Sequence, residues 1–315
     1  MTTSTHVVVG AGAVGRAVAG LLAADGERVV VVTRSGSGPS HPLVENVAAD
    51  ATDADRLTEL ATGAVALHNC ASPQYHRWTT DWPPLAAAML TAASRTGAVL
   101  ATVSNLYGYG PCPMPMTEET PLAATSRKGQ VRARMWQEAL AAHWAGDVRV
   151  TEVRGSDYLG VGPNSFMHDR AVPALLAGRT VRVLGDPDAP HTWTWVGDIA
   201  RMLVVAARDE RAWGRAWHVP SPEPVTSRQL VADLARTAGV VPVDVRSLPG
   251  GLLRVAGLFS PVLRELPEVA YQHDRPFVMD SSAAQATFGL APSEWGTILA
   301  DTLRRPGDHT RVDAA

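Results

Sequence analysis

The sequence is nearly devoid of lysine. Lys128 is the only one, so the other members of its 28 lysine and arginine residues are all arginines. The formal net charge is only -3 at pH 7, and no block of like charges is present. A nucleic acid or an acidic membrane surface is usually bound through concentrated positive charge, so neither is expected as the main partner. The isolated lysine raises the question of whether it has a chemical role.

Cysteine and long apolar runs are also scarce. Cys70 and Cys112 are the only cysteines, and they do not have metal-ligand spacing, so neither a disulfide framework nor a metal site is expected. No stretch reaches the roughly 18 apolar residues that a membrane span requires, and the N-terminus does not resemble a signal peptide. These absences predict a cytoplasmic protein, a monomer or homodimer, whose main partner is a small molecule.

The first 155 residues alternate short β-branched runs with alanine-rich and leucine-rich stretches of helical period. This alternation predicts an α/β fold, a Rossmann-type doubly wound parallel sheet covered by helices on both faces. The predicted strands are 6–10, 28–32, 43–50, 64–70, 97–105 and 148–154. The predicted helices are 13–25, 53–62, 82–96 and 127–145.

The alternation of strand-like and helix-like stretches ends after Arg154, which predicts a second, smaller domain. The motif "HTWTWV" and a helical pattern over 197–209 look like a return to the first domain. We therefore predict a dinucleotide-binding domain from residues 1–154 and about 190–220. The remaining residues, 155–189 and about 221–315, are predicted to form a substrate-binding lid.

The strongest local motif is a glycine fingerprint directly after the first predicted strand. Gly10, Gly12 and Gly15 form G-x-G-x-x-G, and Ala13 and Val14 open the helix that follows. In such a motif the first glycine makes the tight turn, the second lets a pyrophosphate approach, and the third lets helix and strand pack closely. The helix N-terminus then faces the phosphates, so a bound dinucleotide is expected.

The end of the second predicted strand bears on the choice of cofactor. An acidic residue there usually binds the ribose 2′-hydroxyl of NAD, whereas an arginine accommodates the 2′-phosphate of NADP. This chain has Thr33, Arg34 and Ser35 at that place, with no carboxylate. A guanidinium can make two hydrogen bonds to a phosphate, so the pattern predicts NADPH. The alternative is that Arg34 is an ordinary solvated loop cation.

The motifs as a set resemble the extended short-chain dehydrogenase/reductases, the class of the NAD-dependent epimerases and dehydratases. They are the glycine fingerprint, Asp50-Ala51 after the third strand, "HNCAS" (68–72), "SNLYGYGP" (104–111) and "WVGDIA" (195–200). The resemblance implies that Asp50 and Ala51 lie near the adenine. It also implies that Asn69, Cys70 and Ala71 lie along the ribose, and that the C-terminal lid holds the substrate.

The same resemblance implies a Ser or Thr after the fifth strand and a Tyr-x-x-x-Lys pair on the next helix, where tyrosine moves a proton and lysine assists it. That pair is missing, because the residue four places after each of the five tyrosines is never lysine. In the preferred alignment Lys128 replaces the tyrosine and Arg132 replaces the lysine. In the alternative alignment Lys128 is the retained lysine and Ala124 replaces the tyrosine.

The preferred alignment predicts the catalytic groups. Lys128 would donate a hydrogen bond to the substrate oxygen, and Arg132 would hold the nicotinamide ribose. Ser104 would polarise the substrate carbonyl, with Thr102 as the alternative hydroxyl. Asn105 is a second candidate donor near the substrate, whereas Tyr107 belongs to the "YG" motif of the family and is expected to be structural.

Methionine and aromatic side chains gather in the segments expected around the substrate. Such side chains suit a flat apolar ligand, although they would also pack the small domain. The candidates are Met114, Met116, Tyr158, Phe166 and Trp193, together with an apolar stretch over 252–266.

We therefore expect an NADPH-dependent ketoreductase that reduces an aromatic polyketide-like ketone in secondary metabolism without a catalytic tyrosine. Atypical members that act on angucyclinones, as in simocyclinone assembly, resemble this chain in type. A nucleotide-sugar epimerase or dehydratase is the alternative, with Arg170, Arg179 and Arg275 as cations for the diphosphate. A non-catalytic NADPH-binding sensor is a third possibility.

Overall fold

A computed structural model describes residues 3–162, 166–248 and 264–304, and the chain divides into two compact units. Unit 1 consists of Met1–Gly155, Gly197–Pro220 and Asp280–Leu290. Unit 2 consists of Ser156–Val196, Ser221–Met279 and Ala291–Ala315.

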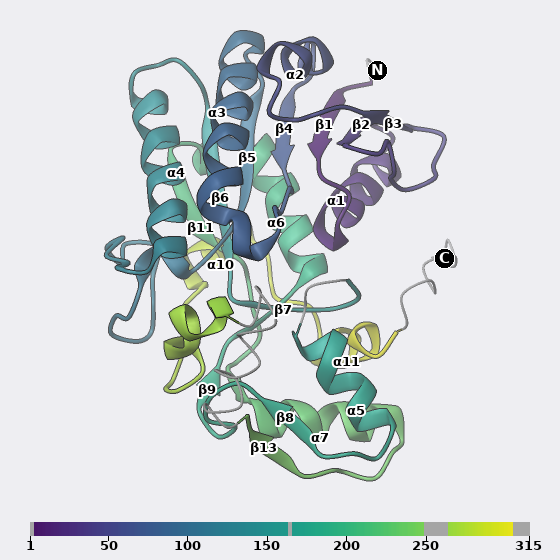
Figure 1. Cartoon of the computed structure of the whole chain (residues 1–315). Helices are drawn as coiled ribbons and strands as arrows, with labels where there is room; N and C mark the ends of the chain where they lie inside the picture. The colour runs from purple at the N-terminus through teal and green to yellow at the C-terminus, as the bar shows by residue number, and fades with distance from the viewer. Residues whose placement is uncertain (1–2, 163–165, 249–263, 305–315) are drawn as a thin grey trace. The chain divides into compact units, whose positions relative to one another are not determined.

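Unit 1 is built on a seven-stranded sheet with the order β11-β6-β5-β4-β1-β2-β3 (Figure 1). Every neighbouring pair is parallel, so the predicted doubly wound α/β fold is confirmed. The chain order reverses between β1 and β4, and ligands of such sheets bind beyond the carboxyl ends of the strands at this point. The strands are β1 (Thr5–Val9), β2 (Arg28–Thr33), β3 (Val44–Ala48), β4 (Ala66–Asn69), β5 (Val99–Asn105), β6 (Val150–Gly155) and β11 (Arg215–His218).

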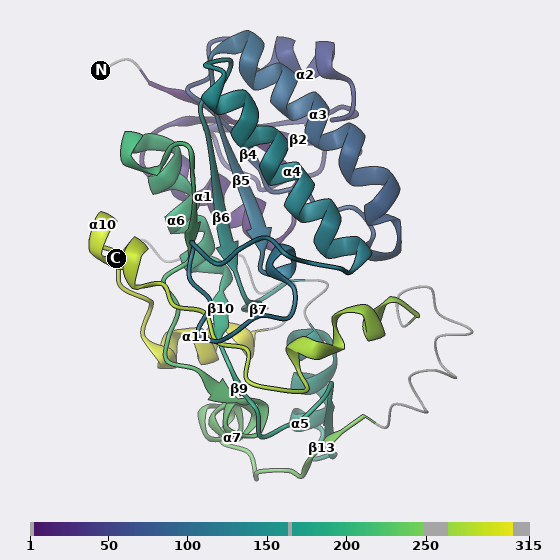
Figure 2. The same ribbon diagram turned by 90° about the vertical axis from the view of Figure 1, so that its left-hand side faces the viewer.

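Helices cover both faces of this sheet. Figure 2 shows α3 and α4 on one side and α1 and α6 on the other. The helices of unit 1 are α1 (Ala13–Ala24), α2 (Ala54–Ala61), α3 (Trp78–Thr96), α4 (Arg127–Trp144), α6 (Val196–Arg208) and α10 (Ser282–Phe288), with short 3-10 turns η1 (Tyr75–Arg77), η2 (Tyr107–Tyr109) and η4 (Glu210–Ala212). The four helices predicted before Arg154 are therefore present, with ends that differ by a few residues.

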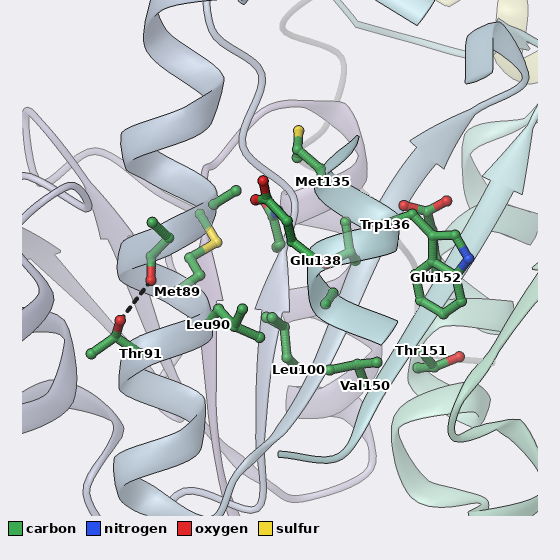
Figure 3. A pocket seen from close by; sticks show the side chains of 15 residues that line it. Met89, Leu90, Thr91, Leu100, Met135, Trp136, Glu138, Val150, Thr151 and Glu152 are labelled. Atoms are coloured by element: carbon green, nitrogen blue, oxygen red, sulfur yellow. Dashed lines mark hydrogen bonds between the residues drawn. The ribbon is translucent and has the colours of Figure 1, made fainter. Parts of the chain in front are cut away.

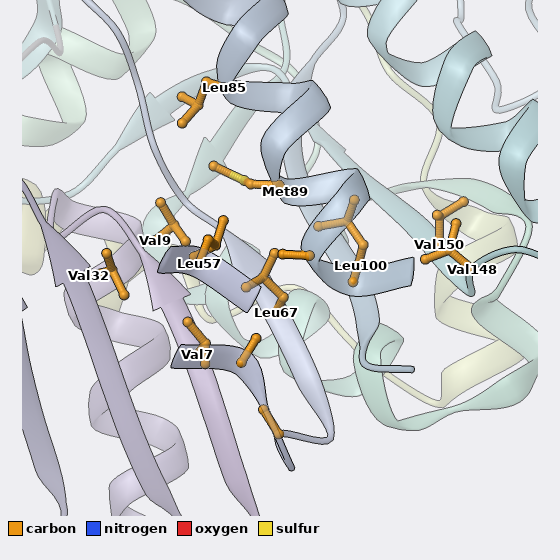
Figure 4. Packing of buried hydrophobic residues seen from close by; sticks show 14 of the residues in the cluster. Val7, Val9, Val32, Leu57, Leu67, Leu85, Met89, Leu100, Val148 and Val150 are labelled. Atoms are coloured by element: carbon orange, nitrogen blue, oxygen red, sulfur yellow. The ribbon is translucent and has the colours of Figure 1, made fainter. Parts of the chain in front are cut away.

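The core of unit 1 lies between the central strands and the helices α2 to α4. Val7 and Val9 of β1, Leu67 of β4 and Leu100 of β5 pack against Met89 of α3 (Figure 4). The middle strands are apolar along most of their length because both faces of a parallel sheet are covered. This core holds the carboxyl ends of β1, β4 and β5 in place.

Unit 2 contains three two-stranded pairings. β7 (Asp157–Leu159) pairs parallel with β10 (Trp193–Trp195), β9 (Pro190–His191) pairs antiparallel with β12 (Val225–Thr226), and β8 (Val181–Val183) pairs parallel with β13 (Val245–Ser247). Its helices are α5 (Val172–Leu176), α7 (Ser227–Ala238) and α11 (Trp295–Thr302), with a π-helix η3 (Met167–Ala171) and a 3-10 helix η5 (Leu266–Gln272).

The boundary between the units differs from the predicted one. Residues 190–196 were predicted to return to the dinucleotide-binding domain, but they belong to unit 2 because β10 pairs with β7. Conversely, Asp280–Leu290 belongs to unit 1 rather than to the second domain. Most of the apolar stretch over 252–266 lies outside the described residues.

Within the described residues, no helix has both the length and the apolar character needed to cross a bilayer.

A buried chain of hydrogen bonds links β6 to β11 in unit 1. Arg154 donates to the Tyr109 hydroxyl at 2.8 Å, and that hydroxyl lies 2.7 Å from Nε2 of His218. Nδ1 of His218 lies 2.7 Å from the carbonyl oxygen of Asp280 and must donate to it, because a carbonyl only accepts. Nε2 of the neutral ring therefore accepts from Tyr109. Burial lowers the pKa of His218 to about 4 and raises that of Tyr109 to about 12.

This histidine makes stability depend on pH. The unfolded chain takes up a proton near pH 6.5, whereas folded His218 does so only near pH 4, so its contribution is complete above about pH 6.5 and is lost as the pH falls through that window. Between pH 7 and pH 5 we expect a loss of about 2 kcal/mol from this residue. His218→Asn should flatten the pH dependence of the free energy of unfolding, measured by chemical denaturation. The exposed control His76→Asn should leave it unchanged, and an unaltered slope in His218→Asn would contradict the assignment.

Candidate dinucleotide and catalytic site

The glycine fingerprint forms the turn between β1 and α1 as the sequence predicts. Gly10 has φ +97°, which favours glycine, and an added Cβ would lie 2.8 Å from the carbonyl oxygen of Cys70. An added Cβ on Gly15 would lie 1.9 Å from the carbonyl oxygen of Gly10. An added Cβ on Gly12, by contrast, would meet nothing within 4 Å among the described residues. Gly10 and Gly15 are therefore needed by the fold, whereas Gly12 leaves open space above the turn.

The open space lies at the start of α1. Gly12 is the N-cap, and no side chain caps the helix among the described residues. The first turn, which includes Ala13 and Val14, carries no acidic residue. Unused backbone N–H groups and the positive end of the helix dipole are the features that bind phosphate. The turn therefore fits a pyrophosphate group.

The motif that follows β4 lies against this turn. Cys70 donates its backbone N–H to Val9 at 3.0 Å, and the side chain of Asn69 accepts from Ala71 at 3.3 Å. Asn69 and Cys70 are both buried, and burial raises the pKa of the Cys70 thiol. The structure thus brings 69–71 beside the fingerprint, and it gives Cys70 a packing role rather than a reactive thiolate.

The carboxyl ends of β2 and β3 present the residues predicted to choose the cofactor. Arg34 and Ser35 are exposed, and the Thr33 hydroxyl donates to the carbonyl of Ser37 at 2.9 Å. Two residues after β3, Asp50 is exposed and accepts two hydrogen bonds from Thr52, which lower its pKa. Ala51 is partly buried beside it. Arg34 is therefore positioned at the surface and carries its charge where a solvent-facing ligand group can reach it.

Lys128 is not a surface residue. It lies in the first turn of α4, which Ser126 caps by accepting from Gly129, and only 2% of Lys128 is exposed. Its Nζ lies 4.6 Å from the centroid of the Tyr75 ring, a cation–π distance. Lys128 is therefore a buried residue beside an aromatic ring and not a solvated side chain.

Tyr75 is a residue that the sequence reasoning missed. It belongs to η1, a few residues after the "HNCAS" motif, and its hydroxyl lies 3.5 Å from that of Tyr107. The family pattern places tyrosine and lysine four positions apart on one helix, and Tyr75 does not fit that pattern. Lys128 instead meets Tyr75 from a different element, and the position of Tyr75 just beyond β4 was the one available signal. The two tyrosines and the lysine form what we call the Lys128 cluster.

Arg132 lies one helical turn after Lys128 and is 6% exposed. Its guanidinium lies 4.7 Å from the Trp82 ring centroid and 5.5 Å from that of Trp78, and it donates to the carbonyl of Val103 at 2.9 Å. These contacts tie α4 to α3 and β5. The role of Arg132 as a ribose ligand stays a prediction.

The start of α4 also bears on the two alignments. The helix begins at Arg127, so Ala124 precedes the N-cap and does not share a helical face with Lys128. Lys128 and Arg132, by contrast, both lie on α4 and are separated by one helical turn, as in the preferred alignment.

Among the candidate hydroxyls at the end of β5, Ser104 is 1% exposed and Thr102 is partly buried. Asn105 is partly buried and accepts from the backbone of Tyr107 at 3.2 Å.

Comparison with known proteins decides the family. The model of the NAD dependent epimerase/dehydratase family matches residues 6–219. This chain belongs to that family. The resemblance drawn from the motifs is thereby confirmed at the family level, and the assignment supports an enzyme of the oxidoreductase type.

Individual relatives share less than a third of their residues with this chain. A UDP-glucose 4-epimerase of Mycolicibacterium smegmatis is 27% identical over 268 residues, which cover 75% of this chain and 82% of that protein. The crystal structure of a Brucella ovis UDP-glucose 4-epimerase in complex with NAD has a TM-score of 0.76, 21% identity and coverage of 96% of this chain and 98% of that one. A Bacillus anthracis dTDP-glucose 4,6-dehydratase in complex with NAD has a TM-score of 0.76, 19% identity and 96% coverage of both chains.

Two of the predicted substrate residues of this family member are core residues. Met116 is 0% exposed, and its carbonyl accepts from the backbone of Asp280 within unit 1. Trp193 is 5% exposed, donates to the carbonyl of Val225 at 3.1 Å and packs in the core of unit 2. Both side chains pack within their own units, and their contact with a ligand stays a prediction. Met114, Tyr158 and Phe166 are partly buried and stay predictions.

A cavity of about 190 Å³ opens between α3 and α4 over β5 and β6 (Figure 3). Met89 and Leu90 of α3 and Met135 and Glu138 of α4 line it. None of the six predicted substrate residues does so, and Asn69 is the only predicted cofactor residue that does. This cavity is therefore distinct from the predicted substrate site.

Proposed function

We propose that this chain is a nicotinamide-dependent oxidoreductase whose substrate is a nucleotide sugar. Two features of unit 1 carry the proposal. The turn at Gly12 has open space that fits a phosphate group, and Lys128 is a buried cation. The substrate class rests on the relatives, whose names are those of enzymes acting on UDP-glucose and dTDP-glucose. Arg170, Arg179 and Arg275 are exposed within unit 2, and their role as cations for a diphosphate stays a prediction from the sequence.

Lys128, Ser104 and Tyr75 have separate roles in the proposed reaction. A bound nicotinamide dinucleotide would supply or accept hydride, and the turn between β1 and α1 would hold its pyrophosphate. Lys128 donates a hydrogen bond from Nζ to the reacting substrate oxygen and stabilises negative charge there, with the Ser104 hydroxyl as a second donor. The Tyr75 hydroxyl, which lies near that of Tyr107, takes or gives the proton of that oxygen.

We further propose that the cofactor is NADP rather than NAD. Arg34 is exposed at the end of β2, and Thr33 stands where an acidic residue would repel the 2′-phosphate. This preference also bears on the reaction, because a net reduction consumes NADPH, whereas an epimerisation returns the cofactor to its starting state.

The cofactor proposal gives a direct prediction. Arg34→Ala should weaken NADPH binding by about 10–100-fold, the loss of a charge-assisted bond worth about 1.5–3 kcal/mol. NADH binding should change by less than about twofold under the same logic. Both affinities are measured by fluorescence titration. Arg28→Ala, an exposed position at the opposite end of β2, is the control. Equal affinity of the unaltered protein for NADH and NADPH would contradict the proposal.

A second candidate is a ketoreductase acting on an aromatic polyketide-like ketone, such as an angucyclinone. The observation that favours it is the absence from the sequence of any tyrosine followed four places later by lysine. A phenol hydrogen-bonded to the ketone on the substrate itself would supply the proton, so a family tyrosine would not be required. Lys128 and Ser104 would then polarise the ketone.

One substrate panel separates the candidates. The protein is incubated with NADP(H) or NAD(H) and with UDP-glucose, dTDP-glucose, a hydroxylated polycyclic ketone or a simple ketone. Loss of NADPH absorbance reports reduction, and chromatography of the products reports epimerisation or dehydration, which leave the cofactor unchanged overall. Turnover of the nucleotide sugars supports the main proposal, and turnover of phenol-bearing ketones alone supports the second. Tight cofactor binding without any turnover would support the sensor and overturn both.

A further inference from the structure

Three side chains that are far apart in the sequence meet inside unit 2. Asp157 opens β7, His191 ends β9, and His273 directly follows η5. Their donor atoms all lie within 4.8 Å of one another. Oδ2 of Asp157 lies 3.2 Å from Nε2 of His191 and 3.6 Å from Nε2 of His273.

The surrounding chain holds the two imidazoles in place. The ring of His191 stacks on that of His273 at 5.3 Å and 8°, and it also lies 5.4 Å from the ring of Phe277. The chain passes so close to His273 that an added Cβ on Gly185 would lie 2.3 Å from the His273 carbonyl oxygen. His191 itself is 4% exposed. The ring nitrogens are therefore preorganised, with the carboxylate beside them.

The distances from Asp157 to the two histidine nitrogens are close to those between metal ligands. Zinc binds histidine nitrogen and carboxylate oxygen at about 2.0–2.2 Å in a tetrahedral arrangement, which places neighbouring ligand atoms about 3.3–3.5 Å apart. The two distances to Asp157 fall close to that range. The buried Nε2 of His191 faces Oδ2 of Asp157 at 3.2 Å.

We propose that Asp157, His191 and His273 form a binding site for a divalent cation of the zinc class. Two imidazoles and one carboxylate suit Zn²⁺ and related transition metals better than Mg²⁺ or Ca²⁺, which prefer oxygen ligands. Three protein ligands leave a fourth position for water or for an oxygen of a bound molecule. The sequence predicts no metal site, because its two cysteines lack metal-ligand spacing and these three ligands share no local motif.

The first test measures metal alone. Untagged full-length protein is stripped with a chelator and titrated with Zn²⁺ by calorimetry, with metal content checked by mass spectrometry after dialysis. We expect one Zn²⁺ per chain and an increase in Tm. Asp157→Asn and His273→Gln should each weaken binding by at least about 100-fold, because each removes one of three ligands. The control His76→Gln alters an exposed histidine of unit 1 and should bind as the unaltered protein does.

Substitution with Co²⁺ gives an independent readout, since a four-coordinate cobalt site absorbs visible light strongly and a surface-bound ion does not. We expect this absorption in the unaltered protein and its loss in Asp157→Asn, with circular dichroism showing a retained fold. Substoichiometric binding, or equal binding by both ligand variants, would overturn the proposal and make the cluster a metal-free hydrogen-bonded triad. Neither readout depends on enzymatic activity, so failure here is separate from failure of the proposed function.

Discussion

Replacement of Lys128 by methionine is expected to lower kcat by about 100-fold or more while leaving the fold intact. The lysine is buried with its Nζ over the Tyr75 ring, so its ammonium lies beside the proposed proton-transfer group. Methionine fills nearly the same volume and tolerates an aromatic neighbour, so packing is retained. The loss should appear in kcat rather than in cofactor affinity, because the interaction is made with the reacting oxygen.

Arg127→Met is the matched control for this prediction. It removes one positive charge from the preceding residue, which is exposed. We expect its kcat and its Tm to stay close to those of the unaltered protein. Equal activity of Lys128→Met and Arg127→Met on the substrate identified by the panel would remove Lys128 from the mechanism.

A companion variant separates the lysine from the tyrosine beneath it. Tyr75→Phe keeps the ring that faces Lys128 and removes only the hydroxyl that lies 3.5 Å from Tyr107. If Tyr75 transfers the proton, kcat falls by about 100-fold and its pH dependence changes. Unchanged kcat together with an inactive Lys128→Met would leave the proton to Lys128 or to the substrate.

The second large effect is expected at Gly12. Gly12→Val should reduce dinucleotide affinity by about 100-fold or more, because its side chain would occupy the open space that the pyrophosphate needs. The fold should be retained, since no described atom lies within 4 Å of the added Cβ. Affinity is measured by fluorescence titration and stability by thermal unfolding. Gly20→Val on the same helix, where an added Cβ also meets nothing, is the control and should bind normally.

Gly15 provides the contrast. Gly15→Ala places a methyl group 1.9 Å from the carbonyl oxygen of Gly10, so helix and turn must separate. We expect a loss of stability of about 1–3 kcal/mol or more, visible as a lower Tm before any ligand is added. If Gly12→Val lowered the Tm as much as Gly15→Ala, the space at Gly12 would not be open. The loss of dinucleotide affinity would then reflect a damaged fold and not a blocked pyrophosphate site.

The sequence by itself determined the architecture of unit 1. Period-2 and period-3.6 patterns each report a local preference, and six of the seven strands and five of the helices followed from them. The fingerprint was equally predictable, because Gly10 adopts a positive φ and Gly15 lies against the carbonyl of Gly10, five residues earlier. Such features depend on neighbours along the chain, so no knowledge of distant contacts was needed.

Only the tertiary structure decided which side chains meet. Lys128 and Tyr75 come from α4 and η1, and no sequence spacing relates them. The same holds for Asp157, His191 and His273, which three separate elements bring within 4.8 Å. These constellations depend on the packing of elements, which fixes distances between residues of unrelated position.

The boundary between the units and the burial of candidate ligands were also decided in three dimensions. Residues 190–196 have an aromatic β pattern that suits either unit, and their pairing with β7 placed them in unit 2. Met116 and Trp193 are of residue types found both in cores and in ligand pockets, so composition alone did not separate the two roles. A local pattern specifies an element and its apolar face, whereas the partner of that face is determined by the whole chain.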